Sequence, residues 1–95
     1  MDNWIFADPP NVAVLTTRSI VEEGRWIANV SHDEDDGGWQ FHDDDGMPKG
    51  EEEARVVSLR SIVAKDASLT QLADLPLGWR AWRTAPEGEW QRARA

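Results

Sequence analysis

The stretch RWIANVSHDEDDGGWQFH, residues 25–42, decides the fold. Its first part alternates between apolar and polar side chains, with Trp26 and Val30 on one side, which is the period of a half-buried strand. Asp36-Gly37-Gly38 is a hairpin signal, because glycine supplies the positive φ that tight hairpin turns require. After the turn, Trp39 begins a second strand in the alternation that suits burial. The sequence therefore predicts a β-hairpin whose tryptophans lie in the core.

The segments on either side predict further strands and two short helices. Residues 11–17 form an apolar, β-branched run typical of a buried strand, and residues 55–58 form a shorter one. Ser58 is placed to cap a helix, and a second helix over residues 66–75 ends before a proline. Residues 78–83 predict a last strand with Trp79 facing the core. The predicted fold class is α+β: a small antiparallel β-sheet with one or two short helices packed on one face.

The chain length limits the number of domains, and the cysteine content limits the kind of fold and compartment. A chain of 95 residues is expected to form a single domain over 1–95, with an ordered core at about 11–83. Residues 1–10 and 84–95 are expected to be peripheral, and residues 43–53 to form a mobile acidic loop. The absence of cysteine excludes a disulfide framework and suits a reducing compartment. The first residues lack the basic region of a signal peptide, so we expect a cytoplasmic protein.

The charge points to a class of partner. A net charge of −8, from 18 acids and 10 bases, repels nucleic acid and anionic lipid, so we expect no nucleic-acid partner and no membrane partner. Residues 31–53 carry ten acids against one lysine. Such a run either serves solubility alone or steers a basic protein towards the surface. The predicted partner-binding residues are the acids of this run together with an arginine-flanked tryptophan that supplies contact area: Asp33, Glu34, Asp35, Asp36, Asp43, Asp44, Asp45 and Trp82.

The two histidines of the same region raise a metal-binding alternative. His32 and His42 come close to cross-strand neighbours if the hairpin is centred on Gly37, and Asp33 and Asp43 stand beside them. The acidic run fails the calcium-loop pattern, because glycine stands where an oxygen ligand should be. The chain has no G-x-S-x-G motif, no phosphate-binding glycine loop and no cysteine nucleophile. We therefore expect neither an enzyme nor a cofactor.

The order of these signals resembles a known family. The segments that carry the resemblance are Asp36 to Phe41, Val56 to Leu59, and Leu72 to Trp79, within a match of about residues 12 to 79. The chain resembles a family of small bacterial domains of unknown function, some of whose members are assigned as immunity proteins of polymorphic toxin systems. The resemblance implies an α+β binding domain without established chemistry. Ala67 departs from it, because a proline is expected after the aspartate that starts the second helix.

Three hypotheses follow. The first is a small acidic domain that binds another, basic protein, as an immunity protein that neutralises a cationic toxin would. The second is a metal-binding domain built on the two histidines. The third is an accessory domain that forms a homo-oligomer through the edge of its sheet, which an exposed Trp82 strand would permit.

Overall fold

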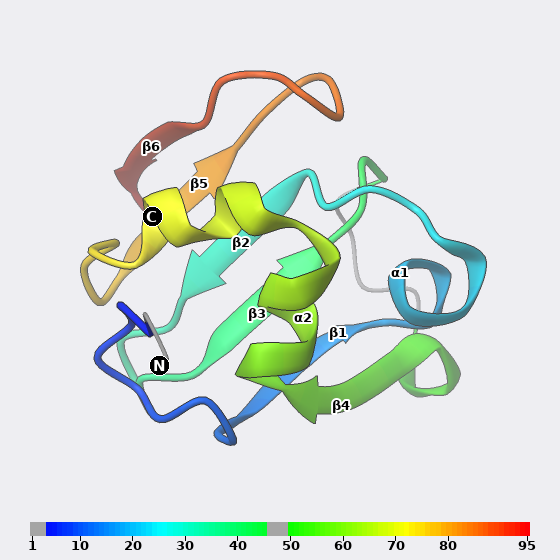
Figure 1. The fold of residues 1–95 in the computed structure, drawn as a ribbon, viewed down its shortest axis with the longest axis horizontal. Coiled ribbons are helices and arrows are strands. Elements are labelled where there is room, and N and C mark those ends of the chain that lie inside the picture. Colours follow the sequence, from blue (N-terminus) through cyan, green and yellow to red (C-terminus); the bar gives the residue numbers. More distant parts are fainter. Residues whose placement is uncertain (1–3, 46–49) are drawn as a thin grey trace.

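A six-stranded sheet forms the centre of the computed structural model, which describes residues 4–45 and 50–95 (Figure 1). The strand order is β4-β1-β3-β2-β5-β6, and every neighbouring pair is antiparallel except β1 and β3, which run parallel. The strands are β1 (Ala13–Thr17), β2 (Asn29–His32), β3 (Trp39–His42), β4 (Ala54–Ser58), β5 (Trp79–Trp82) and β6 (Gln91–Arg94). This mostly antiparallel sheet with short helices confirms the predicted α+β class.

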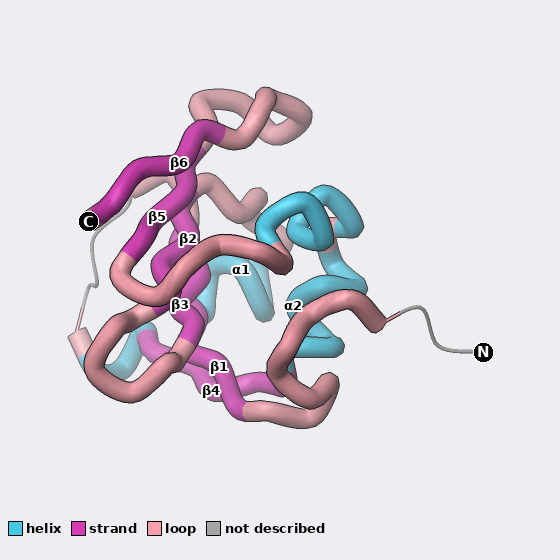
Figure 2. Tube along the Cα trace, turned by 90° about the vertical axis from the view of Figure 1, so that its left-hand side faces the viewer, coloured by secondary structure: helices cyan, strands magenta, loops and turns pink. Residues whose placement is uncertain are grey.

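Short helices connect the strands: α1 (Arg18–Glu23), α2 (Leu59–Lys65) and the 3-10 helices η1 (Glu51–Glu53) and η2 (Ala67–Leu72). Figures 1 and 2 show α2 and η2 on the same face of the sheet. The Ser58 side chain caps α2 by accepting a hydrogen bond from the Ser61 backbone N–H at 3.1 Å, as the sequence predicted. No helix in the described part of the chain is long and apolar enough to cross a membrane.

The core lies between the sheet and the helices that cover it. Trp39 is only 3% exposed, which confirms its predicted burial, and the indole Nε1–H donates to Asp8 Oδ2 at 2.7 Å. The buried apolar cluster contains Phe6, Val14, Ile20, Ile27, Val30, Trp39, Phe41, Leu59, Ile62, Leu69, Leu72, Leu75 and Ala81. Because each strand alternates, the opposite face of the sheet carries the remaining side chains of the strands.

The hairpin register differs from the predicted one. His32 pairs with Trp39, and Asn29 pairs with His42, so the two histidines are not cross-strand neighbours. Paired residues of an antiparallel ladder share a face, and successive residues alternate. His32 therefore lies on the helix-covered face with Trp39, whereas His42 lies on the opposite face. A turn centred on Gly37 was the wrong assumption, because the bend that joins β2 to β3 spans residues 33–38.

The terminal segments take a larger part in the fold than the sequence predicted. Phe6, in the segment expected to be peripheral, is buried in the core, and the final segment contributes the edge strand β6. Since β6 pairs with β5, the strand that carries Trp82 is not an edge strand, and its edge cannot serve self-association. The predicted mobile loop at 43–53 includes residues 46–49, which lie outside the described residues.

Trp26 does not occupy the predicted core position. It precedes β2, which begins at Asn29, and is half-buried, whereas the neighbouring Ile27 is buried. The segment before β2 is held by its backbone, since the Ala28 N–H donates to the His42 carbonyl at 2.9 Å. The strand alternation assumed from the sequence therefore does not extend back to Trp26.

Candidate functional site

The bend between β2 and β3 carries four acids, Asp33, Glu34, Asp35 and Asp36, which we call the acidic bend. Backbone hydrogen bonds close it: Asp33 N–H donates to the Gly38 carbonyl at 2.7 Å, and Gly37 N–H donates to the Asp33 carbonyl at 2.9 Å. Asp36 Oδ1 accepts from the Gly38 N–H at 2.8 Å. Gly37 has φ 73°, a conformation that glycine adopts without steric cost. These hydrogen bonds hold the backbone of the loop that carries the four acids.

The acidic bend borders a pocket of about 430 Å³. All four of its acids line this pocket, together with Trp79, Gly78, Ser31, His32, Gln40 and Ala95. Asp33 Oδ2 accepts a hydrogen bond from Gln40 Nε2 at 2.7 Å. Within residues 4–45 and 50–95, none of the four acids forms an ion pair. The pocket therefore concentrates negative charge that no described cation neutralises.

His32 is packed against the core side of this site. Its ring stacks on Trp39 with centroids 3.9 Å apart and planes 12° apart. Its Nδ1 lies 2.7 Å from the Leu75 carbonyl oxygen, and because a carbonyl can only accept, Nδ1 carries the hydrogen. His32 thus joins the hairpin to the segment that follows η2.

His42, on the other face, does not meet His32. Its Nε2 lies 3.1 Å from Gln40 Oε1, and its Nδ1 is buried with no hydrogen-bond partner in the part of the chain that the structure describes. Burial lowers the pKa of His42, and the carboxylates of Asp43 and Asp33 oppose this shift more weakly. Among the described side chains, no group of three or more histidines and acids is arranged to hold a metal ion. The structure thus lacks the pairing on which the metal-binding alternative depended.

The acids that follow β3 are engaged within the molecule. Asp43 is 5% exposed, and its Oδ2 accepts from Ser19 Oγ at 2.5 Å while its Oδ1 accepts from the Asp45 N–H at 3.0 Å. Asp44 forms an ion pair with Arg25. Asp43 was predicted to face a partner, and the structure corrects this, because donors from α1 and from its own loop hold the carboxylate inside.

Trp82 lies apart from the acidic bend. In β5 it pairs with Asn29, whereas Trp79, at the other end of the strand, pairs with His32. Trp79 lines the acidic pocket, and Trp82 is half-buried on the opposite face of the sheet with the Arg80 guanidinium 4.5 Å above its ring. The structure therefore brings Trp79, and not Trp82, together with the acids of the bend.

Arg83 was expected beside Trp82, but its side chain points into the molecule. Its Nε donates to the Ile27 carbonyl at 2.9 Å, its Nη1 donates to Ser68 Oγ at 3.1 Å, and its Nη2 pairs with Asp66. The Trp90 ring lies 4.4 Å from the guanidinium carbon. Alternation along β5 could have revealed this, because Trp79, Ala81 and Arg83 share one face.

The chemistry available at the acidic bend is electrostatic. Carboxylates at an exposed bend attract and hydrogen-bond cationic groups, and the half-buried Trp79 offers an aromatic surface beside them. The bend also lies next to an apolar side chain: a Cβ atom at Gly37 would be 3.9 Å from Leu77 Cδ2, and Leu77 is 53% exposed.

The chain matches no family model, no curated protein and no solved structure.

Proposed function

We propose that this chain is a small acidic binding domain that captures a basic protein through its acidic bend. The observation that supports the proposal is the pocket of about 430 Å³ lined by four carboxylates that make no ion pair with any described residue. A pocket of this volume has room for the end of an arginine or lysine side chain. The net charge of −8 would speed the encounter with a cationic surface.

Apolar groups next to the acidic bend add contact surface to its charge. Trp79 lines the same pocket, and an aromatic ring beside carboxylates suits a guanidinium, which stacks on rings and donates two parallel hydrogen bonds to one carboxylate. Leu77, exposed next to the bend, adds apolar area at the rim. Arginine is therefore the favoured residue of the partner.

The resemblance to immunity proteins narrows the proposal further. An immunity protein neutralises a toxin by covering a surface that the toxin needs, and a cationic toxin surface would suit the acidic bend. The expected finding is that co-expression of this chain relieves the lethality of a toxin encoded by a neighbouring gene. A variant with a neutralised bend would lose that protection.

The binding proposal is tested by neutralising the bend. The test variant carries Asp33→Asn, Glu34→Gln, Asp35→Asn and Asp36→Asn, which keep a hydrogen-bond acceptor at each position. The matched control carries glutamate-to-glutamine changes at four exposed positions elsewhere, Glu51, Glu52, Glu87 and Glu89. Both variants lose four negative charges, so their net charges are equal.

The probe is a tetra-arginine peptide, titrated by calorimetry at low and at physiological salt. We expect the bend variant to bind it at least about tenfold more weakly than the control, and the unmodified chain to lose affinity as salt rises. Equal losses in the two variants would show that net charge alone attracts the peptide and would refute a specific site at the bend. Affinity that does not change with salt would refute it as well.

A further inference from the structure

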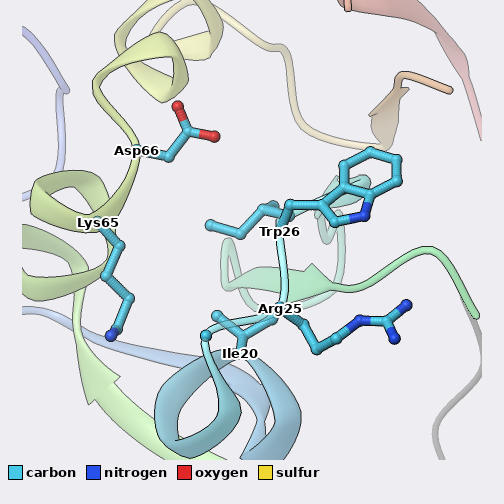
Figure 3. A pocket seen from close by; sticks show the side chains of 7 residues that line it. Ile20, Arg25, Trp26, Lys65 and Asp66 are labelled. Atoms are coloured by element: carbon cyan, nitrogen blue, oxygen red, sulfur yellow. The ribbon is translucent and has the colours of Figure 1, made fainter. Parts of the chain in front are cut away.

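A second pocket lies at the other side of the molecule, between the end of α1 and the junction of α2 with η2. Its volume is about 300 Å³, and it is lined by Ile20, Gly24, Arg25, Trp26, Ile27, Lys65 and Asp66. Figure 3 shows Lys65 and Asp66 entering from the α2 side and Trp26 from the opposite side. This volume is at the small end of the range for ligand pockets, so it suits a ligand of few atoms.

Most of the charged groups at this pocket already have partners. Arg25 pairs with Asp44, and its guanidinium points away from Lys65 in Figure 3. Asp66 pairs with Arg83 through Oδ2 and accepts the Ser68 N–H through Oδ1 at 3.0 Å.

Lys65 is different, since its exposed side chain makes no hydrogen bond or ion pair with any other residue in the described ranges. An entering ligand therefore meets one uncompensated charge, which is positive.

The rest of the lining is apolar and aromatic. Ile20 and Ile27 are buried and contribute aliphatic surface. Trp26 is half-buried, and its indole N–H has no hydrogen-bond partner among the residues described. The Arg83 guanidinium carbon lies 5.9 Å from the Trp26 ring centroid, so the π-surface of this ring already has a cation beside it. A second cation on the ring would be repelled, whereas a flat neutral group would not.

We propose that this pocket binds a small carboxylic acid that carries a flat apolar group. Its carboxylate would pair with the Lys65 ammonium group, and its flat part would lie against the Trp26 indole. Such a ligand satisfies the one uncompensated charge and covers the half-buried ring. This site is independent of the acidic bend, which attracts groups of the opposite charge.

The test uses three probes that share one ring and differ in charge: phenylacetate, phenylacetamide and benzylamine. Each is titrated into 15N-labelled protein while the indole N–H signals are followed by NMR, and a Trp26→Phe variant assigns the Trp26 signal. We expect phenylacetate to shift this signal and to bind about fivefold more tightly than phenylacetamide, as suits one partly exposed ion pair. Benzylamine is expected to bind more weakly than either.

Two charge-matched variants decide whether Lys65 is responsible. Lys65→Gln should bring the affinity for phenylacetate down to that for phenylacetamide and leave the latter unchanged. Arg94→Gln removes the same charge on β6 and should leave both affinities as they are. The proposal is overturned if benzylamine moves the Trp26 signal as strongly as phenylacetate does, or if no probe moves it. A preference for phenylacetate that persists in the Lys65→Gln variant overturns it too.

Discussion

Replacing Arg83 with methionine removes the guanidinium that joins β5 to η2 while keeping an unbranched apolar side chain of similar length. The Arg83 side chain is 2% exposed, and it donates to the Ile27 carbonyl, to Ser68 Oγ and to Asp66. In the variant, Asp66 keeps the Ser68 N–H on Oδ1 but loses its cationic partner, and the Ile27 carbonyl loses the Arg83 donor.

The cost follows from these two groups. Removing one partner of a buried ion pair costs about 3–5 kcal/mol, and Asp66 retains 23% of its side-chain exposure, which places this pair at the lower end. A buried carbonyl without a donor costs about 1–3 kcal/mol, part of which the apolar methionine offsets. We expect Arg83→Met to lower the free energy of unfolding by about 3–4 kcal/mol, a large fraction of the roughly 5–15 kcal/mol typical of a domain.

Urea unfolding followed by circular dichroism measures this loss. A double-mutant cycle with Asp66→Asn should give a coupling energy of about 1–3 kcal/mol, because the second change removes the charge that the first leaves unpaired. Arg80→Met is the matched control: Arg80 is exposed, stacks on Trp82 at 4.5 Å, and should cost less than about 1 kcal/mol. A loss below about 1 kcal/mol for Arg83→Met, or additive changes in the cycle, would refute the reasoning.

Two further predictions concern backbone strain and pH. Gly24 and Gly78 have φ values of 72° and 81°, but only at Gly78 would a Cβ atom meet another group, Glu34 Oε1 at 3.2 Å. Gly24→Ala should therefore cost about 1 kcal/mol and Gly78→Ala more, as measured by thermal unfolding; equal costs would show that the Glu34 side chain moves aside freely. Burial lowers the pKa of His42 from its ordinary 6.5, so the unfolded chain binds a proton more readily than the folded one. Stability should be complete above pH 6.5 and fall as the pH drops below it, and His42→Gln should reduce the difference between urea midpoints at pH 7.5 and 5.5; an unchanged difference would contradict this assignment.

Local sequence patterns predicted those strands and helices that bury one of their faces in the core. Alternation correctly located the strand at Trp39, and the Ser58 cap correctly located the start of α2. The register of the hairpin was missed, because every residue from Asp33 to Gly38 tolerates a turn and only the backbone hydrogen bonds select the six-residue bend. β6 was missed because it contains little apolar surface and is held by pairing with β5.

Site residues that depend on distant partners could not be predicted. Asp43 looked like one more surface acid, and its burial depends on Ser19, 24 residues away in sequence. Alternation along β5 could have indicated that Arg83 points inward, but no local pattern identifies its partner Asp66, 17 residues earlier. The exposure of the acidic bend could be predicted, although its centre was misplaced, since four consecutive acids before two glycines need no distant partner to form an exposed turn.

The order of the strands has a consequence for the speed of folding. The β2–β3 hairpin closes over a short loop, whereas β1 must find β4 some 40 residues later and β2 must find β5 some 50 residues later. Pairings between distant segments pay a larger entropic penalty for loop closure and slow the search for the native state. The acidic bend therefore occupies the segment best able to form ahead of the rest, where repulsion between its carboxylates acts on the rate of folding as well as on the finished surface.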